Sequence, residues 1–302
     1  MNEANPKLNS TTAGIAYSTS VVVYILISLL ISIIVTAAKI STEADGFIYL
    51  SYLAAPVAIC IACAFIMKFR GQKFTEVAPV KCHIQYYVIA LLMIFGLLFS
   101  LSKLNGLTLE FLQLLGYKPR EESSYLPSLK GGLIIPALIV IAVLPAVFEE
   151  FLFRGIISRN VRQSVGDVRA IFIVGFSFAL FHGSPEQTVY QFITGCCFSF
   201  LAIRSGSILP SIVMHFLNNA IIIILYACGA TDSGGNLIIS QTGDIILTVV
   251  ALLAFVGAIV WLILDKTPLA KCQKGGVKAF FIYGSVGIII LAVMWILSFI
   301  GV

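Results

Sequence analysis

The chain has 302 residues, of which 59% are apolar and 11% are charged, and its net charge is +5 at pH 7. Soluble globular domains carry about 25% charged residues, so this composition excludes an ordinary soluble fold. The spanning segments of such a chain should be helices, because lipid offers backbone N–H and C=O groups no other partners. The composition therefore predicts an all-α protein, a polytopic helical membrane bundle.

Apolar stretches close to the roughly 20 residues that cross a bilayer occur at nine places along the chain. They lie at 17–39, 46–68, 86–104, 131–153, 169–184, 187–204, 207–229, 244–264 and 279–300. The fifth and sixth are the shortest. We therefore expect about eight to nine transmembrane helices in one membrane domain.

The Lys and Arg residues of the predicted loops indicate how the bundle is oriented. With a cytoplasmic N-terminus, the inner positions are Lys7, Lys68, Arg70, Lys73, Lys81, Arg159, Arg162, Arg169, Arg204, Lys266, Lys271, Lys274 and Lys278. The outer positions are Lys39, Lys103, Lys118, Arg120 and Lys130. The excess on the inner side favours this orientation. Because the positive net charge reflects this loop bias, no nucleic-acid partner is expected.

Three ionisable residues, Glu149, Glu150 and Arg154, lie in or beside the fourth apolar stretch. Each charged residue near the bilayer centre costs about 2.5–3.5 kcal/mol on insertion scales, and such residues mark functional sites by default. Glu150 and Arg154 are four residues apart, so they should pair on one helix face. Glu149 is rotated by about 100° and stays available as a base. The alternative is an ion network that only holds helices together.

Two histidines, His182 and His215, lie in later apolar stretches and can reach the depth of Glu149. The polar break at 164–167 should turn the fourth helix back into the fifth, with Glu149 and His182 equally far from the turn. His215 lies about 15 Å, at 1.5 Å per residue, into the seventh helix. We therefore expect all three side chains at one level, nearer the inner face.

Each histidine shares a helix face with another motif residue, because Phe178 precedes His182 by four positions and Asn219 follows His215 by four. His215 and Asn219 are expected to donate hydrogen bonds to a developing oxyanion, worth about 2.7–4 kcal/mol per donor in hydrolytic sites. Asn218 points elsewhere and should form a clasp between helices. The alternative is that these residues only pack or join helices.

Several other catalytic patterns are missing. The sequence has no HExxH, no GxSxG and no Walker loop, and no aspartate lies inside a predicted span. These absences disfavour a zincin, an elbow-type serine hydrolase and an intramembrane aspartyl dyad. We also find no inverted repeat of the kind that transporters carry.

The three motifs together resemble those of the CPBP (CAAX protease and bacteriocin-processing, or Abi) family of intramembrane proteases, related to type II CAAX prenyl endopeptidases. The family pattern is EExxxR, FxxxH and HxxxN on successive helices. The matching residues are Glu149, Glu150, Arg154, Phe178, His182, His215 and Asn219. The pattern is met without a departure, and the resemblance covers roughly 130–225.

The resemblance implies that Glu149 and His182 activate a water molecule while His215 and Asn219 stabilise the oxyanion. The supporting residues are Glu150, Arg154 and Phe178. It also divides the single membrane domain into N-terminal helices (1–125), a catalytic core (126–230) and C-terminal helices (231–302).

By this resemblance the expected function is intramembrane hydrolysis of membrane-associated or lipidated peptides, in CAAX-type or in bacteriocin or pheromone processing. The alternatives are a bacteriocin immunity or scaffold protein, and a zinc-dependent form of the same protease that uses Glu149, His182 and His215 as ligands. No cofactor is favoured, because the glutamate and the histidine suffice as acid–base groups. The short chain resembles bacterial members, so a bacterial plasma membrane is expected.

Overall fold

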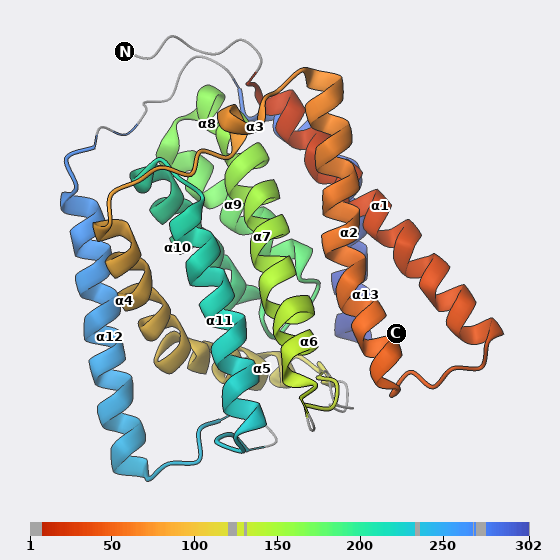
Figure 1. Cartoon of the computed structure of the whole chain (residues 1–302), viewed down its shortest axis with the longest axis vertical. Helices are drawn as coiled ribbons and strands as arrows, with labels where there is room; N and C mark the ends of the chain where they lie inside the picture. Colours follow the sequence, from red (N-terminus) through yellow and green to blue (C-terminus); the bar gives the residue numbers. More distant parts are fainter. Residues whose placement is uncertain are drawn as a thin grey trace.

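A computed structural model describes residues 8–119, 126–129, 132–232, 236–267, 269 and 276–301. The loop positions Lys7, Arg120, Lys130, Lys271 and Lys274 lie outside these residues. The described part is a bundle of helices (Figure 1), and no strand forms in it. The predicted all-α, polytopic fold is confirmed.

Most of the bundle consists of long helices joined by short connections. In chain order these are α1 (Ser10–Ala37), α2 (Asp45–Arg70), α4 (Gln85–Phe99), α5 (Leu104–Leu114), α9 (Asp167–Phe181), α10 (Thr188–Ser205), α11 (Leu209–Ala227), α12 (Gln241–Leu264) and α13 (Lys278–Ile300). A short helix α3 (Phe74–Val77) follows α2, and a 3-10 turn η1 (Leu101–Lys103) joins α4 to α5.

One long helix of five consecutive segments precedes α9. Its segments are α6 (Ile134–Ala137), η2 (Leu138–Val143), α7 (Leu144–Glu150), η3 (Phe151–Ile157) and α8 (Ser158–Val165). Two of them, η2 and η3, are π-helical. In Figure 1 this composite helix runs through the middle of the bundle beside α11.

Seven helices in the described part are long and apolar enough to cross a bilayer, which is fewer than the eight to nine expected. They are Ser10–Ala37, Asp45–Arg70, Gln85–Leu114, Ile134–Val165, Leu209–Ala227, Gln241–Leu264 and Lys278–Ile300. The stretches predicted at 169–184 and 187–204 form α9, of 15 residues, and α10, of 18 residues. Because α10 contacts α9, α11, α4 and α5, much of its surface faces protein, and it need not be as apolar as a lipid-facing helix.

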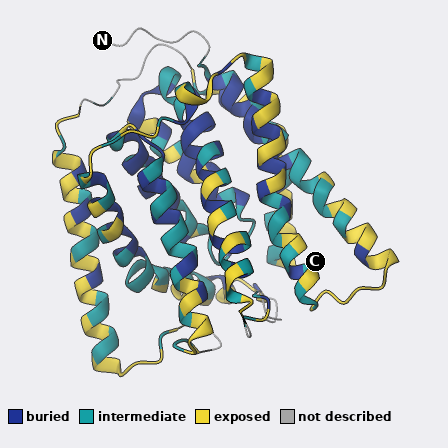
Figure 2. Cartoon of the chain, viewed as in Figure 1, coloured by how far each residue is buried: buried dark blue, intermediate teal, exposed yellow. Residues whose placement is uncertain are grey.

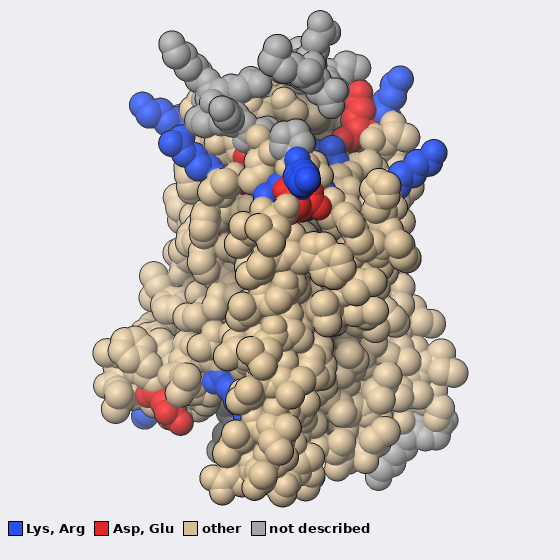
Figure 3. Space-filling model, turned by 90° about the vertical axis from the view of Figure 1, so that its left-hand side faces the viewer, with Lys and Arg blue, Asp and Glu red and all other residues tan. Residues whose placement is uncertain are grey.

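Burial and charge both fit a molecule surrounded by lipid. Buried residues gather on the inner faces of the central helices, whereas the outer helices α1, α12 and α13 carry many exposed apolar side chains (Figure 2). On the face shown in Figure 3, charged side chains lie toward the two ends, and a broad belt between them carries none. The direction in which the bundle crosses the membrane stays a prediction.

Glycines allow neighbouring helices to approach closely at three interfaces. A Cβ atom on Gly175 of α9 would lie 2.4 Å from Cys196 Sγ of α10, and one on Gly195 of α10 would lie 2.9 Å from Gly175 Cα. Gly14 brings α1 onto α13 in the same way, and Gly96 brings α4 onto α12. Small residues at helix contacts are the usual route to tight packing in lipid, where the hydrophobic effect does not drive helices together.

The polar break at 164–167 forms the predicted turn between α8 and α9. Gly166 adopts a φ of +79°, a conformation that only glycine adopts at little cost. Arg162 donates from Nε and Nη2 to the two carboxylate oxygens of Asp167, at 2.7 and 2.9 Å. This ion pair joins the end of α8 to the beginning of α9 and fixes the direction in which α9 returns through the bundle.

Candidate active site

The glutamate pair lies at the end of α7, between the two π-helical segments. A π-helix uses i→i+5 hydrogen bonds, is rare, and often marks functional sites. Pro145, in the first turn of α7, has no N–H group and so cannot donate to the carbonyl of Ile141 four residues earlier. Asn219 Nδ2 of α11 donates to that oxygen, at 3.0 Å. The irregular helix therefore offers a backbone acceptor to a motif residue.

Glu150 is the centre of a fully buried ion network. Its Oε1 accepts a hydrogen bond from Arg154 Nη1 at 2.8 Å, and neither side chain is exposed. The same oxygen lies 3.0 Å from His215 Nδ1 of α11. The predicted pair on one helix face is confirmed, and the structure adds His215 as a second partner that ties α11 to α7.

Aromatic rings and a backbone carbonyl surround the Arg154 guanidinium. Its Nη2 donates to the carbonyl oxygen of Gly195 at 3.0 Å, which the close approach of α9 and α10 brings into place. Its Cζ lies 4.4 Å from the centroid of the Phe178 ring and 5.2 Å from that of Phe198. Such cation–π contacts stabilise a desolvated cation. The charge of Arg154 is thus compensated by groups from α7, α9 and α10.

Glu149 is buried but does not take part in that network. It is 8% exposed, and its Oε2 has no hydrogen-bond partner among the described residues. Its carboxylate is close enough to His182 and Arg154 to influence both electrostatically. The shared depth of Glu149 and His182 stays a prediction.

His182, at the C-terminal end of α9, is held in one tautomer by its own helix. Its Nδ1 lies 2.9 Å from the carbonyl oxygen of Phe178. Because a carbonyl oxygen can only accept, Nδ1 must carry the proton, and Nε2 of the neutral ring is left as an acceptor. The Phe178 ring packs on the imidazole, with centroids 4.6 Å apart. The arrangement leaves Nε2 able to take a proton from water.

A chain of hydrogen bonds on α10 and α11 orients the Asn219 amide. Tyr190 OH donates to Asn218 Oδ1 at 3.5 Å, and Asn218 Nδ2 donates to Asn219 Oδ1 at 3.0 Å. With Nδ2 of Asn219 donating to Ile141, both ends of this amide have a fixed partner. An amide nitrogen carries two protons, so Asn219 keeps one N–H for a further acceptor. Asn218 forms the clasp that the sequence predicted.

The residues that contact and support the motif side chains could hardly be recognised from the sequence. Pro145 is the one usable sign, since a proline inside a helix frees a carbonyl four residues earlier. The Gly195 carbonyl and the rings of Phe198 and Tyr190 carry no pattern of their own. They take part because of how α10 packs, which depends on tertiary structure.

Within the described residues, no group of three or more His, Cys, Asp or Glu side chains is placed to hold a metal ion. Glu149, His182 and His215, the set that would bind zinc in the alternative mechanism, are all described and do not form such a group. We therefore derive no step of the reaction through a metal.

Comparison with known proteins identifies the class of the segment that carries these residues. Residues 131–221 match the family model described as "Type II CAAX prenyl endopeptidase Rce1-like". This range contains all three motifs, from Glu149 to Asn219, and is therefore similar to the CAAX-type intramembrane endopeptidases. Neither a curated protein nor a solved structure matches the chain. With its long apolar helices, the protein is an integral, multi-pass membrane protein.

The different surroundings of the two glutamates predict opposite effects on stability. Glu150→Gln removes one partner of a buried pair and leaves Arg154 uncompensated, which costs about 3–5 kcal/mol. Glu149→Gln removes a desolvated charge that has no partner at Oε2 and keeps the shape, so its stability should be unchanged or higher. Thermal melting of both purified variants in detergent checks this. A Glu149→Gln variant that melts below Glu150→Gln would reverse the assignment.

Proposed function

We propose that this protein is an intramembrane endopeptidase that hydrolyses peptide bonds of membrane-associated or lipidated peptides, with a water molecule activated by Glu149 and His182. The observation that carries the proposal is the buried Glu149 carboxylate, which has an oxygen without a partner among the described residues and interacts with His182. The match of this segment to an endopeptidase family supports it.

The proposed first step is attack of water on the peptide carbonyl. The Glu149 carboxylate, or Nε2 of the neutral His182, accepts a proton from the water as its oxygen bonds to the carbonyl carbon. In the second step the C–N bond breaks, and the stored proton passes to the leaving amine. Such positioned proton transfer contributes typically about 10²–10⁴-fold to a rate. No covalent bond to the protein is required.

His215 and Asn219 are proposed to stabilise the negative oxygen of the tetrahedral intermediate. Asn219 has one N–H left after donating to Ile141. His215 donates from Nδ1 to the Glu150 carboxylate, so its Nε2 carries a proton only when the ring is an imidazolium. The supporting role of Glu150 is therefore to hold Arg154 and to orient the His215 ring.

The proposed substrates reach the site from the membrane, because the motif residues lie within apolar helices. The name of the matching family points to peptides with a prenylated CAAX end, and we extend the proposal to lipidated or membrane-bound peptides such as pheromone and bacteriocin precursors. The loop charges support a cytoplasmic N-terminus, and a bacterial plasma membrane is the proposed location.

Loss of either proposed acid–base group should stop cleavage without unfolding the protein. Glu149→Gln and His182→Ala are each expected to lower the rate by about 100-fold or more on a quenched fluorescent peptide with a farnesylated CAAX end. Glu110→Gln, on the exposed face of α5, is the matched control and should keep full activity.

Retained activity in Glu149→Gln would contradict the assigned role. If the unmodified chain leaves the farnesylated reporter and an unlipidated membrane-anchored reporter intact, the proposed substrate class is wrong, and a binding role such as bacteriocin immunity is favoured.

Metal removal separates the proposed mechanism from its zinc-dependent alternative. If Glu149 and His182 act on water directly, cleavage should survive exhaustive chelation, and elemental analysis of the purified protein should find no stoichiometric zinc. Stoichiometric zinc, together with activity that is lost on chelation and restored by zinc, would contradict the metal-free mechanism.

A further inference from the structure

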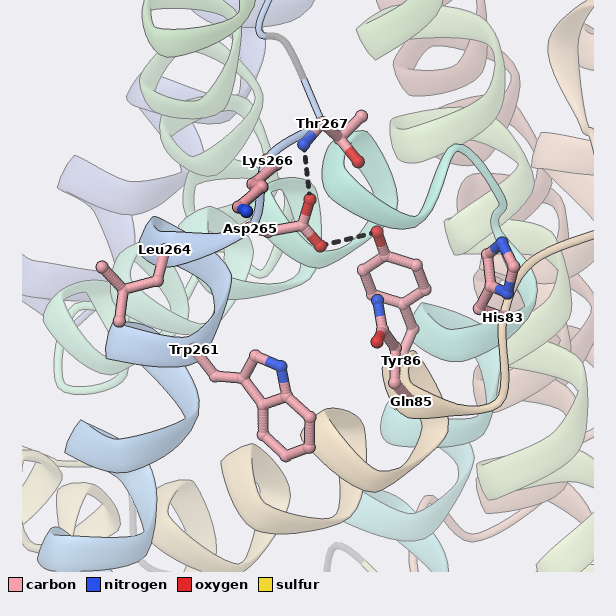
Figure 4. A pocket seen from close by; sticks show the side chains of 8 residues that line it. All are labelled: His83, Gln85, Tyr86, Trp261, Leu264, Asp265, Lys266 and Thr267. Carbon is pink, nitrogen blue, oxygen red and sulfur yellow. Dashed lines mark hydrogen bonds between the residues drawn. The ribbon is translucent and has the colours of Figure 1, made fainter.

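A polar hollow lies apart from the three motifs, where α4 begins and α12 ends (Figure 4). Its volume is about 500 Å³. Its lining includes Gln85 and Tyr86 at the beginning of α4, Trp261 in the last turns of α12, and Asp265 and Lys266 directly after it. None of them belongs to the candidate active site.

Asp265 is held rigidly at the edge of this hollow. Its Oδ2 accepts a hydrogen bond from Tyr86 OH at 2.8 Å, and its Oδ1 accepts one from the Thr267 N–H at 2.7 Å (Figure 4). The largely buried Arg204 of α10 donates to the backbone carbonyls of Ile263, Asp265 and Thr267. These contacts place the carboxylate on a fixed backbone at the end of α12.

The carboxylate stays charged and keeps room for another donor. Burial acts to raise the pKa of Asp265, but hydrogen bonds from Thr267 and Tyr86 and the charge of Arg204 hold it below its ordinary value. The two carboxylate oxygens together have four lone pairs, and the donors within the chain are Tyr86 OH and the backbone and side chain of Thr267, so one lone pair is left. The hollow therefore offers an anionic acceptor to a ligand that brings N–H groups.

The other lining groups supply an aromatic surface, a cation and a connection to lipid. Trp261 lies one helical turn before Asp265 and is 42% exposed; indole rings attract cations and concentrate at membrane interfaces. Lys266 is exposed and carries a positive charge next to the carboxylate. Leu264, also lining the hollow, is 71% exposed, so the hollow opens toward the apolar outer face of α12.

We propose that this hollow binds the headgroup of a phosphatidylethanolamine lipid. The primary ammonium donates to Asp265 beside the Trp261 ring, the phosphate faces Lys266, and the acyl chains follow Leu264 along the exposed side of α12. Besides the His83 imidazole, the lining has one carboxylate, Asp265, and one ammonium group, Lys266, and these two match the two charges of a zwitterionic headgroup. An anionic headgroup would be repelled by the negative charge of Asp265, and a choline group has no N–H to donate.

The experiment uses Trp261 as its own reporter, because the chain has two tryptophans. The full chain with Trp295→Phe, in a maltoside detergent, is titrated with dihexanoyl phosphatidylethanolamine, with phosphatidylcholine and phosphatidylglycerol of the same chain length, and with free phosphoethanolamine. We expect a saturable change in fluorescence with phosphatidylethanolamine. Binding of phosphatidylcholine and phosphatidylglycerol should be about tenfold weaker or more, as loss of a charge-assisted hydrogen bond predicts. Free phosphoethanolamine should also bind about tenfold weaker or more, because it lacks the acyl chains that contact α12.

Substitutions then test the assignment of the groups. Asp265→Asn should weaken phosphatidylethanolamine binding about tenfold and Lys266→Gln should weaken it less, whereas the basic control Lys278→Gln, outside the hollow, should bind as before. If Trp295→Phe does not fold, the natural chain and Trp261→Phe are titrated instead. The fluorescence change of Trp261 is then the difference between the two titrations.

Three results would overturn the proposal. They are the absence of a saturable signal, equal affinity for phosphatidylglycerol or for free phosphoethanolamine, and unchanged binding by Asp265→Asn.

Discussion

The candidate site depends on the Glu150 carboxylate, whose Oε1 contacts both Arg154 and His215 within the bundle. Burying these charges is costly, and the cost is offset only where geometry and additional hydrogen bonds are good. The Gly195 carbonyl and the Phe178 ring provide those additional contacts. Glu150 holds Arg154 by a direct ion pair, whereas Glu149 acts on Arg154 only through its charge. One oxygen of each glutamate has no hydrogen-bond partner in the described part of the chain.

The packing of the surrounding helices makes this network possible. Glycines let α9 and α10 approach until Gly195 reaches Arg154, and the pair formed by Arg162 and Asp167 turns α9 back beside the composite helix. The π-helical segments on both sides of α7 change the direction of side chains along that helix. Irregular backbone and small residues thus bring groups from α9, α10 and α11 to the buried pair of Glu150 and Arg154.

Much of this arrangement could be predicted from the sequence, because helix periodicity and chain distance are simple geometry. The spacing of Glu150 and Arg154 predicted their pair, and the polar break at 164–167 predicted the turn at Gly166 between α8 and α9. The partners on α10 could not be predicted, since a backbone carbonyl such as Gly195 has no sequence signal. The stretches at 169–184 and 187–204 were already the shortest of the nine, and they form α9 and α10, a short pair whose packing against protein relaxes the demand for length and apolarity.

The most direct test of the central role of Glu150 is a double-mutant cycle on stability with Glu150→Gln, Arg154→Met and the variant that carries both. Removal of one member of a buried pair leaves the other uncompensated, whereas removal of both is often nearly neutral. Melting curves in detergent should therefore show the double variant losing less stability than the sum of the single losses, with a coupling energy of about 0.5–3 kcal/mol. Losses that simply add would show that the two side chains act independently and would contradict the central role of Glu150.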